Sequence, residues 1–87
     1  MVGGKVVSFI EIFVDPALMD DVVNELAAID DVAEVYEVTG EFDIIAMTVS
    51  RDMEEFRDLL KNKIMKIKGI KTTVSSIVLK EDKGPKK

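Results

Sequence analysis

The chain has 87 residues, a length that fits one domain and leaves no room for a second. It contains no cysteine and no histidine, which excludes disulfides, thiolate metal sites, the usual zinc ligand and the usual general base at neutral pH. The formal net charge of -5 argues against a broad phosphate-binding surface, and no apolar run approaches the roughly 20 residues that span a bilayer.

The chain opens with a predicted strand followed by a helix. Residues 5–14 are mostly β-branched or aromatic, which favours a strand that carries apolar side chains on both faces. Asp15 and Pro16 then suit the N-cap and the first position of a helix. Apolar residues follow at a spacing that places them on one helix face, at Met19, Val22, Val23, Leu26 and Ile29.

A hairpin is predicted after this helix. Val32 begins a second strand that ends near Thr39, and residues 42–49 form a third strand. Gly40 and Glu41 make the turn, because glycine readily takes a positive φ. Two strands joined by so short a connection pair in an antiparallel manner.

A second helix and a fourth strand complete the predicted elements. Asp52 is the expected N-cap, with Glu55 three residues on in a capping-box-like arrangement. Gly69 is the expected left-handed cap at the far end, and residues 70–79 form the last strand. Residues 81–87 have no apolar anchor, so we expect a charged flexible tail. The apolar stripe of the helix comprises Met53, Phe56, Leu60, Ile64 and Ile67.

This order predicts an α+β, ferredoxin-like βαββαβ domain over residues 1–80, with a four-stranded antiparallel sheet and two helices on one face. A sheet with one solvated face should alternate apolar and polar residues. Residues 5–14 and 44–47 instead place apolar groups on both faces. We therefore expect the open face to be covered, most simply by a second copy of the chain. A monomer whose open face is only moderately apolar is the alternative.

No catalytic constellation is evident, and we expect no enzyme, no metal and no cofactor. Two polar features stand out, and both have a structural explanation, since an acid at a hairpin end is usually solvated and threonine favours strands. Together they could hold a zwitterion, with an acid pairing with the α-amino group while hydroxyls and backbone N–H groups take the α-carboxylate. The features are the hairpin acids Glu41 and Asp43 and the hydroxyl run Thr72, Thr73, Ser75 and Ser76.

Three segments resemble the effector-binding domain of the Lrp/AsnC regulators, also called the RAM domain. They are residues 35–46 (VYEVTGEFDIIA), 52–56 (DMEEF) and 67–79 (IKGIKTTVSSIVL). The hairpin pattern valine–threonine–glycine–x–x–aspartate is the most specific part, and the glycine–isoleucine turn into a Thr/Ser strand is the second. The resemblance extends over nearly the whole chain except the tail.

The resemblance implies that two protomers pair sheet to sheet, and that dimers form rings, often an octamer or decamer, with amino acids bound in clefts between dimers. Full-length regulators begin with a helix-turn-helix domain, whereas the first strand here begins almost at the N-terminus. We therefore expect a stand-alone amino-acid sensor that can also modulate full-length regulators and does not bind nucleic acid directly. The implied ligand-binding residues are Gly40, Glu41, Asp43, Thr72, Thr73, Ser75 and Ser76.

Other functions stay open at this point. A purely structural assembly protein would leave the hydroxyl run incidental. A small dimeric α+β-barrel enzyme would usually need a polar catalytic set, often with histidine. The ACT domain is a closer rival, but it tends to place a glycine in the first strand-to-helix loop, where this chain has Asp15 and Pro16. The N-terminus does not read as a signal peptide, so we expect a cytoplasmic protein without a membrane partner, and the composition is weakly typical of a thermophile.

Overall fold

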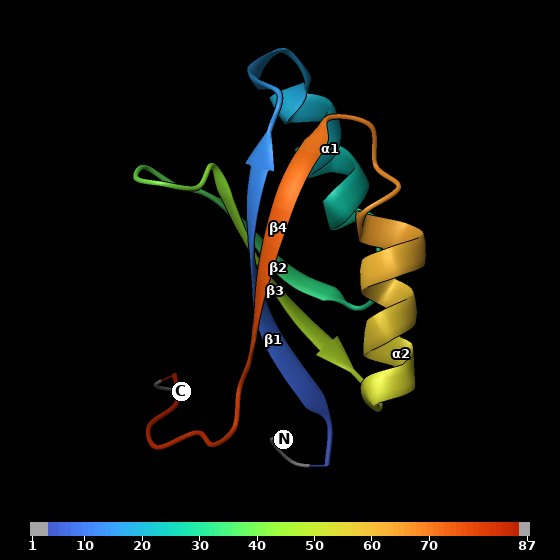
Figure 1. Ribbon diagram of the computed structural model, residues 1–87. Coiled ribbons are helices and arrows are strands. Elements are labelled where there is room, and N and C mark those ends of the chain that lie inside the picture. The colour runs from blue at the N-terminus through green and yellow to red at the C-terminus, as the bar shows by residue number, and fades with distance from the viewer. Residues whose placement is uncertain (1–3, 86–87) are drawn as a thin grey trace.

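A computed structural model describes residues 4–85 and confirms the predicted element order. Two helices lie on one side of the sheet, and the β2–β3 hairpin projects on the other (Figure 1). The sheet has the order β2-β3-β1-β4 with antiparallel neighbours, so β1 is central and β4 is an edge strand. The elements are β1 (Val6–Val14), a 3-10 turn (Pro16–Leu18), α1 (Met19–Ala27), β2 (Val32–Glu37), β3 (Ile44–Ser50), α2 (Met53–Asp58), a π-helical turn (Leu59–Ile64) and β4 (Ile70–Ile77).

Both predicted capping residues are confirmed, although Asp15 caps the 3-10 turn and α1 itself begins only at Met19. The Asp15 carboxylate accepts a hydrogen bond from the backbone N–H of Ala17 at 3.0 Å, and Pro16 stands at the first position. The Asp52 carboxylate accepts from the backbone N–H of Glu55 at 2.9 Å. These bonds satisfy N–H groups that have no partner within the helix.

The second helix departs from the prediction in its last turns, where it widens into the π-helical turn. Leu59 and Ile64 are fully buried although they are five positions apart, whereas Leu60 of the predicted stripe is only half-buried. Met53, also predicted to be in the stripe, is 39% exposed. A π turn inserts an extra residue per turn, which rotates the apolar face. A search for helical spacing assumes a regular period and therefore misses this shift.

Three predicted strand ends are also wrong by two residues each. The second strand ends at Glu37, the third begins at Ile44 and the fourth ends at Ile77. The connection between β2 and β3 therefore spans residues 38–43, and Gly40 within it has a φ of +118°. The apolar character of Val38 and Phe42 favoured strand, but the chain leaves the ladder where the hairpin bends.

The core lies between β1, β3 and the helices. Alternate residues of β1 face the helix layer, so Val6, Ile10 and Ile12 are fully buried. Ser8 also falls on this face, and its hydroxyl bonds with that of Thr48 on β3 at 2.6 Å. This pair satisfies two polar groups that water cannot reach. The other core residues are Val14, Val22, Leu26, Val32, Ile44, Ala46, Phe56, Leu59, Ile64 and Ile67.

The opposite side of the sheet, which we call the open face, is largely apolar, as the sequence predicted. Residues paired across an antiparallel ladder point to the same side, and Phe9 pairs with Met47 while Glu11 pairs with Ile45 and Val74. Phe9 is 44% exposed. Glu11 is the one acid of β1 among these apolar neighbours. The apolar members from β1 and β3 are Val7, Phe9, Phe13, Ile45, Met47 and Val49.

The loop between α2 and β4 requires a glycine, as predicted. Gly69 has a φ of +106°, and its carbonyl accepts from the backbone N–H of Asp15 at 2.8 Å. A Cβ at this position would stand 2.9 Å from the Cβ of Leu18. The first residues of the α1 region therefore pack directly on this backbone.

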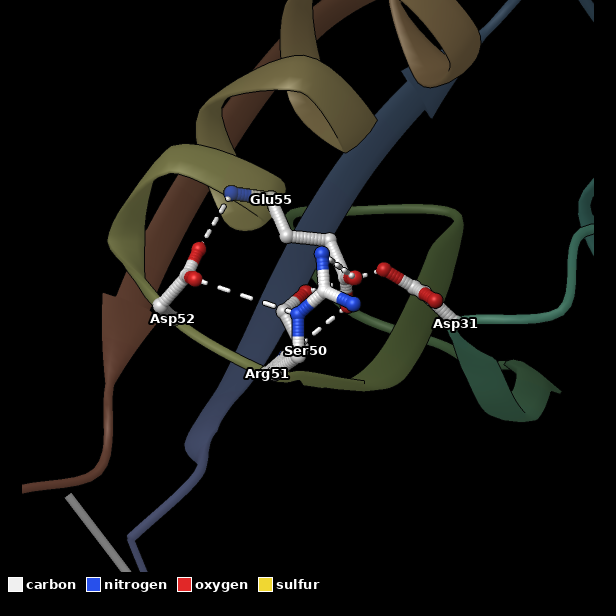
Figure 2. Close-up of polar contacts among 5 residues, drawn as sticks. All are labelled: Asp31, Ser50, Arg51, Asp52 and Glu55. Carbon is white, nitrogen blue, oxygen red and sulfur yellow. Dashed lines mark hydrogen bonds and ion pairs between the residues drawn. The ribbon is translucent and has the colours of Figure 1, made fainter.

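A polar cluster joins the start of β2 to the start of α2 (Figure 2). The Ser50 hydroxyl donates to the Asp31 carboxylate at 3.1 Å, and the backbone N–H of Arg51 donates to Glu55 at 2.8 Å. Partial burial, followed by hydrogen bonding with the Glu55 carboxyl, raises the pKa of Asp31. The bond from the Arg51 backbone lowers the pKa of Glu55. The pKa values of the two carboxyls are thus shifted in opposite directions.

No helix within residues 4–85 is both long enough and apolar enough to cross a membrane.

Alanine substitution of Gly40 in the hairpin and of Gly69 in the α2–β4 loop should separate the cost of backbone strain from the cost of a steric clash. We expect Gly40→Ala to cost roughly 1–2 kcal/mol of unfolding free energy from its positive φ alone, because no atom lies within 4 Å of the added Cβ. Gly69→Ala should lower the unfolding free energy by about 1–3 kcal/mol more than Gly40→Ala does, because the added Cβ would clash with Leu18. Urea denaturation of the two variants measures the difference. Equal losses would show that the approach of Leu18 is not limiting.

The raised pKa of Asp31 makes a prediction for stability as a function of pH. A carboxyl whose pKa is raised in the folded state contributes stability below its unfolded value, near 3.8, and loses it as the pH rises through the folded value. Asp31→Asn removes this loss, so the stability of the variant relative to the wild type should increase as the pH rises from 3 to 7. Midpoints of urea denaturation at about five pH values measure the difference. Asp30→Asn, at the exposed neighbour, is the control. Parallel curves for wild type and Asp31→Asn would contradict a raised pKa of Asp31 in the folded state.

Candidate functional site

Asp43 lies where the hairpin meets the end of β1. Its Oδ2 atom accepts from the backbone N–H of Val14 at 3.1 Å, and its own backbone N–H donates to the carbonyl of Ile12 at 3.1 Å. Its carbonyl accepts from Val38 at 2.9 Å and closes the hairpin. Asp43 is therefore held by three hydrogen bonds, one to its carboxylate and two to its backbone, and the residue is half-buried. Of the predicted ligand-binding residues, Asp43 has the most defined position.

Gly40 and Glu41 are exposed at the tip of the same hairpin. Figure 1 shows this hairpin projecting from the sheet on the side away from the helices. The tip therefore extends beyond the body of the domain, where a neighbouring chain can reach it. Gly40, Glu41 and Asp43 form what we call the hairpin group.

An aromatic pair supports the base of the hairpin. The rings of Phe13 and Phe42 lie with their centroids 4.6 Å apart and their planes at 35°. Such a tilted contact contributes beyond simple burial, and Phe42 directly precedes Asp43. Sequence reasoning did not assign a role to this pair. The signal available was one aromatic residue near the end of the first predicted strand and another directly before the predicted acid.

The hydroxyls of β4 do not form one continuous row. Thr72 and Ser76 pair with Phe13 and Phe9 and so share the open face. Thr73 and Ser75 pair with Ile12 and Ile10 and point to the side of the helices. The predicted hydroxyl run is thus divided between two faces of the sheet.

The central strand separates the hairpin group from the hydroxyls of β4, because β1 pairs with β3 on one side and β4 on the other. Two strand spacings amount to about 10 Å. Thr72 lies nearest to the hairpin group, since it pairs with Phe13 at the same end of the sheet, whereas Ser75 and Ser76 lie further along. Within one chain the seven predicted residues do not form a single pocket.

Two prominent hollows lie on the surface of residues 4–85, and neither is lined by any of the seven residues. One lies beside α1 and is lined by Leu18, Asp21, Asn24, Glu25 and Lys68. The other lies over the open face. Among residues 4–85 no group of three or more acids is arranged to hold a metal ion. The described part of one chain therefore supplies fixed polar groups but does not enclose a ligand.

Comparison with known proteins identifies the family. The family model described as the Lrp/AsnC ligand binding domain matches residues 7–86. An uncharacterised HTH-type transcriptional regulator from Pyrococcus abyssi is 38% identical over 76 residues, which cover 87% of this chain and 48% of the regulator. A homocitrate synthase from Sulfurisphaera tokodaii is 35% identical over 60 residues, which cover 69% of this chain and 13% of that enzyme. The chain spans about half the length of the curated regulators it matches.

Solved structures agree with this assignment. Escherichia coli AsnC superimposes with a TM-score of 0.90 at 29% identity, over 98% of this chain and 58% of that chain. A transcriptional regulator from Neisseria meningitidis, solved as a complex with L-Met, superimposes with a TM-score of 0.86 at 23% identity, over 91% of this chain and 53% of that chain. The second likeness is one of fold alone. Since the family model covers almost the entire chain, this protein belongs to the Lrp/AsnC ligand binding domain family.

Proposed function

We propose that this chain is an amino-acid-binding and oligomerisation module that senses its ligand at interfaces between dimers. The observation that carries the proposal is the fixed carboxylate of Asp43 at the base of a hairpin that projects from the domain. The L-Met complex of the Neisseria meningitidis regulator, which shares the fold, supports an amino acid as the ligand class. The proposed ligand-binding residues remain Gly40, Glu41, Asp43, Thr72, Thr73, Ser75 and Ser76.

The chemistry of these residues suits a zwitterion. Asp43 and Glu41 would pair with an α-ammonium group, since charge-assisted hydrogen bonds to carboxylates are the strongest that a site can offer. The backbone at Gly40 and the strand hydroxyls would take the α-carboxylate. The hairpin group and the β4 hydroxyls lie on opposite sides of β1, too far apart for one small amino acid to contact both within a chain. A neighbouring chain would therefore supply part of the site.

A site divided between chains couples ligand binding to assembly. A ligand that binds only the assembled form stabilises that form by mass action, and several sites in one ring would influence one another through the shared interfaces. Dimers would form by contact of two open faces, and four or five dimers would close into an octamer or decamer. Mixed assembly with full-length Lrp-like regulators would then transmit the ligand signal without direct contact to nucleic acid.

A catalytic role receives little support. The chain has no histidine and no cysteine, and the matched piece of the Sulfurisphaera tokodaii enzyme is only 13% of that protein. A match of this extent suits a regulatory unit better than a catalytic one. A purely structural assembly protein is the second candidate, because the open face supports assembly without any ligand. We place the protein in the cytoplasm, with no cofactor and no membrane partner.

The charge of Asp43 should control the response to ligand. Asp43→Asn retains an oxygen that can accept from Val14 but removes the negative charge, so the fold should persist while affinity for the responsive amino acid falls about tenfold to a hundredfold. Sedimentation velocity and light scattering with a panel of free amino acids measure the response. Glu54→Gln on the exposed side of α2 is the matched control.

The outcomes of this experiment separate the two candidates. Loss of response in Asp43→Asn but not in Glu54→Gln supports the sensor. A ring that forms in the wild type and ignores every amino acid would favour the structural protein. A response that survives Asp43→Asn would move the ligand away from the hairpin group.

The open face should be required for dimers. Phe9→Asp places a charge at the middle of this face, where burial in a dimer would carry a large desolvation penalty, so the variant should sediment as a monomer with an unchanged circular dichroism spectrum. Met65→Asp is the control, because Met65 is 57% exposed and follows the second helix on the other side of the sheet. A Phe9→Asp protein that dimerises like the wild type would exclude the sheet-to-sheet contact.

A further inference from the structure

The C-terminal segment leaves the sheet on the side of the open face. Just past the end of β4, the backbone N–H of Val78 donates to the carbonyl of Val7 at 2.8 Å. Residues 79–85, which we call the arm, then run away from β4 on the side opposite the helices (Figure 1). The hairpin projects on this same side from the other end of the sheet. The open face is therefore bordered by a projecting segment at each end.

The arm does not pack onto the face that it overhangs. A hollow of about 770 Å³ separates them, with Val7, Phe9 and Met47 on its floor and residues 80–85 on its wall. Phe9 remains 44% exposed beneath the arm, and Leu79 at its start is 85% exposed. A segment that served to cover its own sheet would fill this hollow and bury both side chains. The space and the two exposed apolar side chains indicate that something else belongs between them.

Contacts within the arm hold it in a bend. The Lys80 ammonium lies 3.2 Å from the Asp82 carboxylate. The Glu81 carboxylate lies against Gly84, where an added Cβ would stand 2.7 Å from its Oε2 atom. An exposed ion pair contributes little energy, but these short-range contacts favour a compact bend over an extended strand. The contacts that define this bend lie within residues 80–84.

The floor of the hollow is continuous with the rest of the open face. Phe9 and Met47 belong both to the hollow and to the apolar surface that two chains would bury on pairing. A twofold contact between open faces would bring apolar side chains of one chain to this floor, and each chain would offer an identical arm to the other. Glu34 and Lys83 also line the hollow, so its rim carries a negative and a positive side chain. These features fit a second copy of this chain better than a small ligand enclosed on all sides.

We propose that residues 79–85 form an arm that packs on the partner subunit, with Leu79 buried against it and the partner's apolar side chains filling the hollow. The inference rests on the sheet-to-sheet dimer proposed above and adds a second contact region to it. Two arms act in each dimer, one from each chain. The arm therefore contributes to dimer affinity while contributing little to the stability of an isolated domain.

Removal of the arm tests this directly. Sedimentation equilibrium over a range of concentrations would compare the full chain with a chain ending at Val78 and with Leu79→Ser. We expect the dimer dissociation constant to rise about tenfold to a hundredfold on truncation and by a large part of that factor for Leu79→Ser. Thermal unfolding of the monomeric variant Phe9→Asp should not change when the arm is removed.

Two controls address the charge and the exposure of the segment. A chain ending at Pro85 removes only Lys86 and Lys87 and should dimerise like the full chain. Met65→Ser removes another exposed apolar side chain, on the other side of the sheet, and should also leave the dissociation constant unchanged. If the Pro85 truncation alone reproduces the full effect, the terminal lysines and not the arm are responsible, and the proposal is overturned.

Burial of Leu79 by the partner can be observed separately. The chain has no cysteine, so Leu79→Cys provides a single attachment point for a polarity-sensitive dye. Its emission should shift to the blue on dimerisation and return on dilution, whereas a dye at Met65→Cys should not respond.

Three results would overturn the proposed role of the arm. An unchanged dissociation constant after truncation would show that the arm does not contribute to dimer affinity. A tighter dimer after truncation would show that the arm covers its own open face and competes with the partner. A full chain that stays monomeric at all concentrations would exclude the sheet-to-sheet dimer and the arm together, whereas failure of the arm alone would leave that dimer intact.

Discussion

The central strand β1 imposes the main constraint on this molecule, because it carries apolar side chains on both faces while a helix layer covers only one. Its inward residues complete the core with β3 and the helices, down to the paired hydroxyls of Ser8 and Thr48. Its outward residues, with Phe9 most exposed, belong to a surface that one chain leaves open. No element of residues 4–85 forms a second layer over this side of the sheet. The proposed dimer and the proposed arm contact both follow from that imbalance.

Local features of the fold could be predicted because local residues determine them. Asp15 and Asp52 cap their helices through their own side chains, and Gly69 takes the backbone conformation that other residues avoid. The π-helical turn at Leu59–Ile64 could not be predicted, since it depends on how the helix packs on the sheet and interrupts the regular spacing by which helices are recognised.

The candidate site was only partly predictable. The position of Asp43 at the hairpin base follows from the short connection between two strands. Its separation from the β4 hydroxyls depends on the strand order β2-β3-β1-β4, which is a long-range choice that no local pattern specifies. The division of the hydroxyls between two faces was available from the sequence, because even- and odd-numbered positions of a strand point in opposite directions. Reading Thr72 to Ser76 as one run overlooked that alternation.

Glu11 gives the open face a selectivity that its apolar neighbours cannot provide. It stands between Ile45 and Val74 in the middle of the sheet, and a carboxylate enclosed there without a donor would be costly. Apolar contacts alone would accept almost any apolar sheet of similar shape, including those of related chains. A single acid at the centre restricts the choice to surfaces that bring a cation or a hydrogen-bond donor to that point. The identity of the residue opposite Glu11 would thus decide which chains of this family join one another and which remain apart.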